Sequence, residues 1–163
     1  MISRFETLAL CLLLCCQGCA NSREPVDDNT REVAANDTPS VPADFEMMLG
    51  EGGGFSGQWS GYTIRADGSV FAWQGPVAGV NLDSIGVLEP DSLRRIWQRV
   101  KDIGFFSQSM EEAGNITAFV RITADSMEAR ASWIPGVEAI QPPRHEVEAL
   151  YRRTRHLAND LSR

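Results

Sequence analysis

Four cysteines are the residues with the most distinctive chemistry in this chain, and all of them lie at its start. They are Cys11, Cys15, Cys16 and Cys19, and no cysteine follows. Thiolates act as nucleophiles and metal ligands, and exported domains often contain disulfides. Because residues 20–163 have no cysteine, they cannot carry a disulfide, a cysteine-ligated metal or thiol catalysis.

The segment around these cysteines has the composition of an export signal. Its apolar run, residues 8–16, is too short to span ~30 Å of hydrocarbon but has the length of a signal-peptide core. The stretch Cys16-Gln17-Gly18-Cys19 resembles the lipobox of bacterial lipoproteins, although Cys16 stands where that family usually has Leu. The resemblance implies a signal peptide over 1–18 and acylation, as with palmitate, of Cys19. Ordinary secretion with cleavage nearby and an uncleaved anchor stay open as alternatives.

The same resemblance implies where the protein resides. The lipoprotein family attaches several acyl chains to the modified cysteine, and two or more anchoring signals hold a protein stably on a membrane. In enteric bacteria an Asp directly after that cysteine retains a lipoprotein at the inner membrane, whereas Ala20 and Asn21 follow Cys19 here. We therefore expect a lipid-anchored protein of the cell envelope, on the outer membrane and facing the periplasm.

Composition divides the remaining chain into a tether and one domain. Residues 19–43 have no aromatic residue, three prolines, and five acidic residues against two arginines, so we expect a disordered acidic tether. Residues 44–163 contain all four tryptophans and are numerous enough to bury a core. With 16 acidic and 12 basic residues the domain is net negative, which argues against a nucleic-acid partner.

Two turn signals predict two β-hairpins. Asp67-Gly68 is a strong two-residue turn signal, and Asp125-Ser126 marks a second turn. Pairing outward from the first turn sets large apolar side chains on one face, in the pairs Ile64–Phe71 and Tyr62–Trp73. Pairing outward from the second turn gives the pairs Ile122–Ala129, Val120–Ala131 and Ala118–Trp133. Segments 45–49 and 84–88 are candidates for further short strands.

Apolar spacing predicts two helices. One runs from Pro90 to Ile103, with Gly104 suited to end it. The other runs from Pro143 to Asn159, and its outer face is expected to be solvated. That outer face consists of Arg144, Glu148, Arg152 and Arg155. The order ββα-ββα predicts an α+β fold: an antiparallel sheet built from two hairpins, with two helices packed on one face.

A glycine-rich run is the strongest candidate for a binding site. Residues 52–57 fit the pattern G-x-G-x-x-G, but a dinucleotide fingerprint must open a helix, and this run leads into a strand. We therefore expect segment 50–57 to be exposed surface, with Gly53, Phe55 and Trp59 in contact with a ligand. A turn that merely requires positive φ is the competing interpretation.

No set of residues predicts catalysis, a metal site or a cofactor. His145 and His156 are eleven residues apart on one predicted helix, ~16 Å at 1.5 Å per residue, so they cannot bind one metal together. Glu111, Glu112 and Asn115 follow no ordered ligand spacing and are expected in a solvated loop. Arg121 and Arg130 are expected to face each other across the second hairpin. They could hold an anion, but solvent or a nearby carboxylate is the simpler partner.

We favour a non-catalytic module that binds a protein, a peptide or a cell-wall component of the envelope. An inhibitor or a periplasmic chaperone-like module is the alternative, and a hydrolytic enzyme is the third class. An apolar patch around Phe55, Trp59 and Phe119 would favour binding. Acidic residues gathered around His145 in a cleft would favour an enzyme.

Overall fold

The computed structural model describes residues 40–137 and 142–163. The predicted signal peptide, Cys19 and the tether as far as residue 39 lie outside the described residues. No described helix has the length and apolarity needed to cross a membrane.

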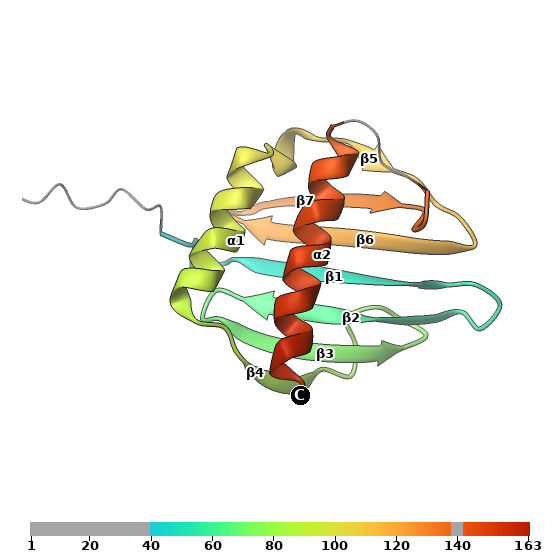
Figure 1. Cartoon of the computed structure of the whole chain (residues 1–163), viewed down its shortest axis with the longest axis horizontal. Coiled ribbons are helices and arrows are strands. Elements are labelled where there is room, and N and C mark those ends of the chain that lie inside the picture. Colours follow the sequence, from blue (N-terminus) through green and yellow to red (C-terminus); the bar gives the residue numbers. More distant parts are fainter. Residues whose placement is uncertain (1–39, 138–141) are drawn as a thin grey trace, which may run out of the picture. The chain divides into compact units, whose positions relative to one another are not determined.

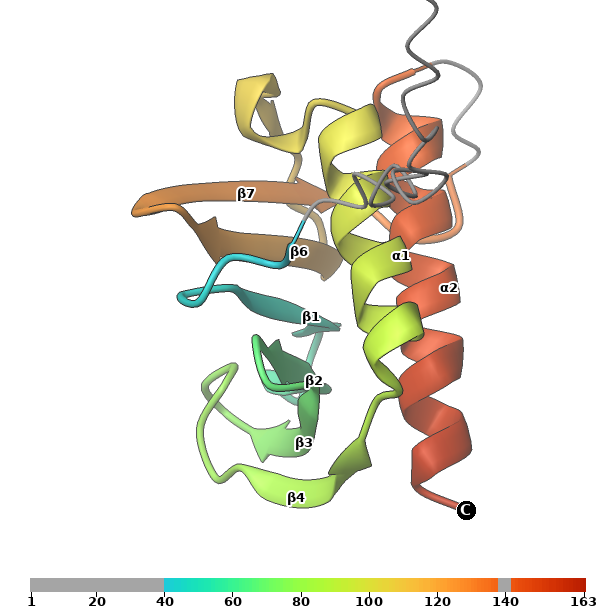
Figure 2. The same cartoon turned by 90° about the vertical axis from the view of Figure 1, so that its left-hand side faces the viewer.

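The described residues form one mixed sheet and two α-helices. Helices α1 and α2 run across the strands and lie side by side on the same face of the sheet (Figures 1 and 2). The strands are β1 (Glu46–Gly53), β2 (Gln58–Arg65), β3 (Ser69–Gly75), β4 (Asp83–Val87), β5 (Met110–Glu111), β6 (Ile116–Ala124) and β7 (Met127–Trp133). The helices are α1 (Pro90–Asp102), the short 3₁₀ helix η1 (Phe105–Ser107) and α2 (Arg144–Leu161).

The α+β class is confirmed, but the sheet is larger than two hairpins. In the described residues it has seven strands in the order β4-β3-β2-β1-β6-β7-β5, antiparallel except where β5 pairs with β7. Strand β1 joins the two predicted hairpins, because it pairs along its whole length with both β2 and β6. The predicted order ββα-ββα is therefore not confirmed: four strands precede α1, and three lie between α1 and α2.

The register of the second hairpin is confirmed. Ala118 pairs with Trp133, Val120 with Ala131 and Ile122 with Ala129. Asp125 and Ser126 both have positive φ, 51° and 62°, as the two central residues of a type I′ turn require. The carboxylate of Asp44 accepts hydrogen bonds from the N–H groups of both turn residues, at 2.8 and 2.7 Å. These bonds lower the pKa of Asp44, the one to Ser126 contributing most.

The register of the first hairpin was wrong by one residue. Ile64 pairs with Val70, and Trp73 with Gly61, because the connection has three residues rather than two. The N–H of Gly68 donates to the carbonyl of Arg65 at 2.9 Å, and Gly68 has φ 84°, as in a type I turn closed by a left-handed residue. The one-residue shift puts Trp73 on the opposite face of the sheet from Ile64.

Both predicted helices are present. Helix α1 begins at Pro90 and ends at Asp102, and Gly104 beyond it has φ 61°, as a left-handed C-terminal residue should. Helix α2 begins at Arg144 and ends at Leu161, two residues later than predicted. The main core lies between these helices and the sheet and contains, among others, Met47, Leu49, Ile64, Val70, Trp97, Val100, Val120, Ile122, Trp133, Val147 and Leu150.

Candidate functional site

The face of the sheet away from the helices carries a second cluster of buried side chains. Met48, Trp73 and Phe119 form it, and Trp59 packs against them. The rings of Trp73 and Phe119 are stacked with centroids 6.2 Å apart, and the ring of Trp59 meets Phe119 edge-on at 5.8 Å. The structure therefore brings the predicted site residue Trp59 against Phe119. Both side chains are packed rather than fully presented to solvent, since Phe119 is buried and Trp59 half-buried.

Glycines in β1 and β2 make room for the two tryptophan rings. A Cβ atom on Gly50 would lie 2.5 Å from Cη2 of Trp73, and one on Gly61 would lie 2.5 Å from Cζ2 of the same ring. A Cβ atom on Gly52 would lie 2.6 Å from Cδ2 of Trp59. Contacts this short exclude any side chain, so these glycines are a packing requirement of the sheet.

The prediction that segment 50–57 is exposed surface was therefore wrong for its first half. Gly50 is buried, and residues up to Gly53 belong to β1, which has a strand on either side. Gly53 has φ 101°, and a Cβ atom there would lie 2.8 Å from the carbonyl oxygen of Asn115. Gly53 thus meets the competing interpretation, a positive-φ position that the fold itself requires.

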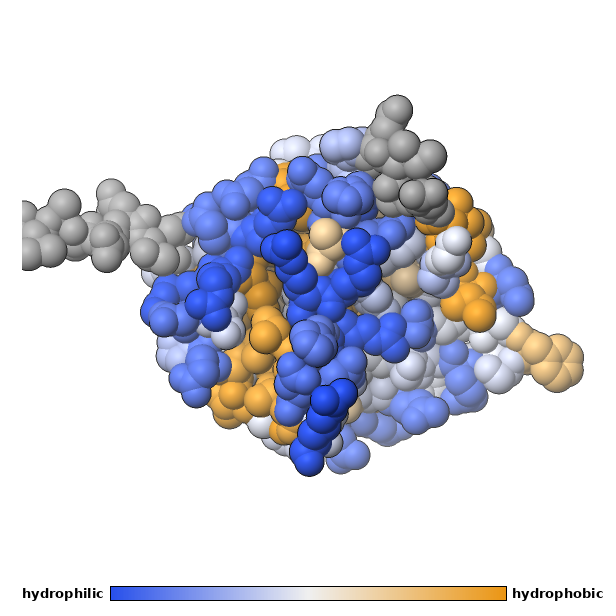
Figure 3. Space-filling view, in the orientation of Figure 1, coloured by the Kyte–Doolittle hydropathy of each residue, from blue (hydrophilic) through white to orange (hydrophobic). Residues whose placement is uncertain are grey.

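The second half of the segment is the exposed tip of a hairpin. Residues 54–57 connect β1 to β2, and the side chain of Phe55 is completely exposed, at 110%. The N–H of Gly54 donates to the carbonyl of Asn115, and the N–H of Gly57 donates to the carbonyl of Gly54 at 3.2 Å. A hydrophobic group projects from the body of the domain at this end of the sheet (Figure 3). The fold holds the base of the loop and leaves its aromatic side chain in water.

Ile116 extends the apolar surface at the base of the hairpin tip. It pairs with Gly53 across β1 and β6, its side chain is 48% exposed, and a Cβ atom on Gly54 would lie 3.8 Å from its Cγ1. We use "hairpin tip" below for residues 54–57 together with Ile116. Of the predicted site residues, Phe55 lies in the hairpin tip and Gly53 is the last residue of β1 before it. Trp59 packs against Phe119 on the face of the sheet away from the helices.

Arginines accompany the aromatic rings on the same open face. Arg65 lies 4.6 Å over the ring of Phe71 and forms an ion pair of 3.7 Å with Glu46. Arg130 lies 5.1 Å over the ring of Phe119 and pairs directly across the strands with Arg121, as predicted. Within the described ranges no carboxylate oxygen lies within 4 Å of the Arg121 or Arg130 guanidinium group. Cation–π contact therefore offsets part of the repulsion between them.

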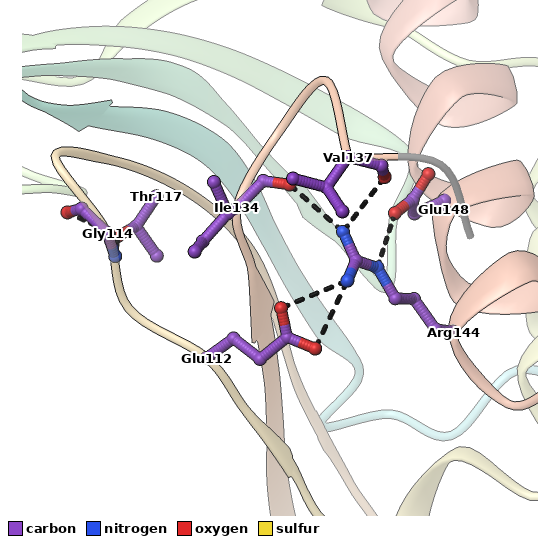
Figure 4. A network of polar contacts seen from close by, with 7 residues as sticks. All are labelled: Glu112, Gly114, Thr117, Ile134, Val137, Arg144 and Glu148. Atoms are coloured by element: carbon purple, nitrogen blue, oxygen red, sulfur yellow. Dashed lines mark hydrogen bonds and ion pairs between the residues drawn. The ribbon is translucent and has the colours of Figure 1, made fainter.

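Arg144 is a structural centre, not the solvated residue that was predicted. Its guanidinium group donates to both carboxylate oxygens of Glu112 at 3.1 and 3.0 Å, and to Glu148 at 2.9 Å (Figure 4). It also donates to the carbonyls of Ile134 and Val137, each at 3.0 Å. The side chains of Arg144 and Glu148 are only 16% and 14% exposed. These bonds tie the start of α2 to the end of β7, so Arg144 has no donor left for a ligand.

A polar cleft of 410 Å³ lies beside the C-terminal half of α2, on the helix face of the sheet. It is lined by Ser60, Gly61, Tyr62, Ala72, Trp73, Gln74, Asn81, Asp83 and Arg155. Arg155 pairs with Glu51 at 2.8 Å and donates to the hydroxyl of Tyr151 at 2.8 Å. Burial raises the pKa of Tyr151 to about 12, and Arg155 counters part of that rise. This cleft was not predicted from the sequence, because the wrong register of the first hairpin separated Tyr62 from the face that carries Gln74.

The two histidines stay apart on the surface of α2. His145 and His156 are both exposed, and Nε2 of His156 lies 3.5 Å from a carboxylate oxygen of Asp160. In residues 40–137 and 142–163, no group of three histidine, cysteine or acidic side chains is arranged to hold a metal ion. Glu112, predicted to be solvated, instead binds Arg144 as described above.

No protein-family model and no curated protein matches this chain. The function is therefore inferred from the arrangement of its residues.

Proposed function

We propose that this chain is a lipid-anchored protein of the cell envelope whose domain is a non-catalytic binding module. The observation that carries the proposal is Phe55, a fully exposed aromatic side chain at the end of a hairpin whose base is fixed by hydrogen bonds. Its partner would be an envelope protein or peptide with an apolar pocket.

The energetics of an exposed phenylalanine support this interpretation. Burying such a side chain in a partner contributes about 1.5–3 kcal/mol. Aromatic anchors that enter pockets are typical of residues that dominate binding energy. Ile116 adds apolar area at the base of the tip, while Gly54 and Gly57, with φ of 66° and 61°, fix its turn. A preordered loop loses less conformational entropy on binding than a disordered one.

The membrane anchor is proposed on the sequence alone. Gly18 and Cys19 match the lipobox, and the acidic composition of residues 19–43 suits a tether between lipid and domain. Ala20 and Asn21 favour the outer membrane by analogy with enteric bacteria. The lipid on Cys19 would place the domain in the periplasm at the membrane surface.

One structural feature favours an inhibitor or a chaperone-like module as the second candidate. The hairpin tip projects from the domain (Figure 3), and the carbonyl of Asn115, directly before β6, accepts a hydrogen bond from the N–H of Gly54 in the tip. Such a wedge could enter the cleft of another envelope protein and block it. The inhibitor and the simple binding module use the same residues and differ in what the partner is.

Two substitutions test the proposal in the native envelope. Cys19→Ser should move the full-length protein from the membrane fraction to the soluble envelope fraction, and unchanged detergent-phase partitioning would contradict the lipid anchor. Phe55→Ala should leave anchoring and folding intact. After chemical crosslinking in the native envelope, however, this variant should recover less of the partner protein than the wild type does. Full recovery of that partner with Phe55→Ala would show that the hairpin tip is not the contact surface.

A further inference from the structure

We propose that the polar cleft beside α2 is a second binding site and that it takes a short, uncharged saccharide. The site lies on the helix face of the sheet and does not include Phe55, so the inference goes beyond the partner site proposed above. Its volume of 410 Å³ is within the range of small-molecule clefts, about 300–1,000 Å³.

The cleft presents both hydrogen-bond donors and acceptors. The sheet contributes Ser60, with its hydroxyl, and Gln74, with its carboxamide, which pair across the neighbouring strands β2 and β3. The segment that enters β4 contributes Asn81, with its carboxamide, and Asp83, with its carboxylate. In the part of the chain that the structure describes, none of these four side chains has a side-chain hydrogen bond or an ion-pair partner. A ligand with several hydroxyl groups can satisfy such a mixed set.

Arg155 also lines the cleft, and part of its guanidinium group is bound by neighbouring side chains. One terminal nitrogen of its guanidinium group binds both Glu51 and the hydroxyl of Tyr151, each at 2.8 Å. The other terminal nitrogen and Nε have no partner among residues 40–137 and 142–163. A planar guanidinium group with two adjacent free donors matches two neighbouring oxygen atoms of a ligand.

Tyr62 supplies an apolar surface to the same cleft. Its hydroxyl donates to the Oδ1 atom of Asn159 at 2.5 Å, so the polar end of the side chain is already satisfied. The half-buried aromatic ring remains available at the cleft wall. Sugars present C–H groups on one side of the ring and hydroxyl groups around its edge, which suits an aromatic surface beside polar side chains.

Charge favours a neutral ligand over an anion. Glu51 already neutralises Arg155, and Asp83 adds a further negative charge to the lining. A phosphate or carboxylate would therefore enter a cleft whose net charge is negative, while a polyol would use both charged groups as hydrogen-bond partners.

Titration of the full-length protein in detergent micelles tests this site, with amide NMR shifts as the readout. The probes are the N-acetylglucosamine trimer and maltotriose, with inorganic phosphate and glycylglycine as competitors of other chemistry. We expect saturable shifts at Gly61, Gln74 and Asn81 with at least one trisaccharide at millimolar concentration. Asp83→Ala should weaken that binding about tenfold. Glu128 is exposed and has no ion-pair partner among the described residues, so Glu128→Ala should leave the binding unchanged.

A second variant separates binding from folding. Arg155→Lys keeps a charge for Glu51 but removes the free guanidinium donors, so it should preserve the fold and weaken the trisaccharide about tenfold. Phe55→Ala should not change the titration, which distinguishes failure of this site from failure of the hairpin tip. The proposal is overturned by the absence of saturable shifts with both trisaccharides. It is equally overturned by shifts with phosphate or glycylglycine alone, or by unchanged affinity in Asp83→Ala.

Discussion

The indole ring of Trp73 lies directly over Gly50, so close that a Cβ atom on Gly50 would stand 2.5 Å from Cη2 of the ring. Trp73 starts from β3 and reaches over β2 and β1 to stack on Phe119 of β6. One side chain thus spans several strands of the open face, and glycines beneath it are what permit this. In β1 the glycine is needed to make room for the Trp73 ring. At the hairpin tip the glycines instead adopt the positive φ values of the turn that carries Phe55.

Gly50→Ala should therefore destabilise the domain by about 3 kcal/mol, because the new methyl group meets both the Trp73 ring and the carbonyl of Ser60. Gly57→Ala is the matched control: apart from its two chain neighbours, no atom of the described residues lies within 4 Å of its Cβ position, so only its φ of 61° is unfavourable. It should cost about 1 kcal/mol. Urea unfolding monitored by tryptophan fluorescence measures both values, and equal losses would contradict the packing account.

Arg144→Lys should destabilise the protein by about 2–4 kcal/mol, because lysine cannot replace the bonds to Glu112, Glu148 and two carbonyls at once. Arg152→Lys on the same helix is the control. Arg152 is 64% exposed and meets Glu148 only at 3.8 Å, so this change should stay within about 0.5 kcal/mol. Thermal unfolding of the two variants would refute the assignment if their midpoints were the same.

Thr154→Val should leave stability unchanged or raise it, because the buried Oγ1 of Thr154 has no hydrogen-bond partner in the described residues. Thr117→Val should instead lower the stability of the fold by about 1 kcal/mol. The hydroxyl of Thr117 accepts a hydrogen bond from the N–H of Gly114 at 3.1 Å and donates one to the carbonyl of Gly114 at 3.4 Å. Chemical denaturation of the Thr154→Val and Thr117→Val variants distinguishes a hydroxyl without a partner from one that is hydrogen-bonded. A clear loss of stability in Thr154→Val would mean that its hydroxyl has a partner after all.

The buried phenol of Tyr151 predicts a loss of stability at alkaline pH. Burial raises its pKa from 10.0 to about 12, so the folded state favours the protonated form more than the unfolded state does. This contribution is fully present below about pH 10 and is lost as pH rises through about pH 12. Unfolding free energies measured over this window should fall more steeply for the wild type than for Tyr151→Phe. Parallel pH profiles would show that Tyr151 titrates normally in the folded protein.

Turn chemistry decided how well the hairpins could be predicted from sequence. Asp125 and Ser126 adopt the two positive φ values of a two-residue turn, so counting outward from them gave the correct pairs. At Asp67-Gly68 the same dipeptide rule failed. Gly68 closes a three-residue connection there, and nothing local in the sequence separates the two cases. The error moved Trp73 to the wrong face and hid the cleft.

The candidate site was predictable only in part, because its packing is non-local. The exposure of Phe55 follows from a glycine-rich segment without periodicity, which sequence reasoning can recognise. The role of Gly50 depends on a tryptophan 23 positions later that crosses two strands, and this requires the strand order. The burial of Arg144 depends likewise on Glu112 and on the connection after β7, which meet only in the folded domain.

Site-specific photocrosslinking at the hairpin tip tests the central claim most directly. A photoreactive phenylalanine analogue would replace Phe55 in the full-length protein in intact cells, and the same analogue at Glu128, also exposed, would serve as the control. Our account predicts one discrete crosslinked product from position 55, lost when excess unmodified protein competes, and none from position 128. Absence of a product at position 55, or the same products from both positions, would contradict the proposal that the hairpin tip binds an envelope partner.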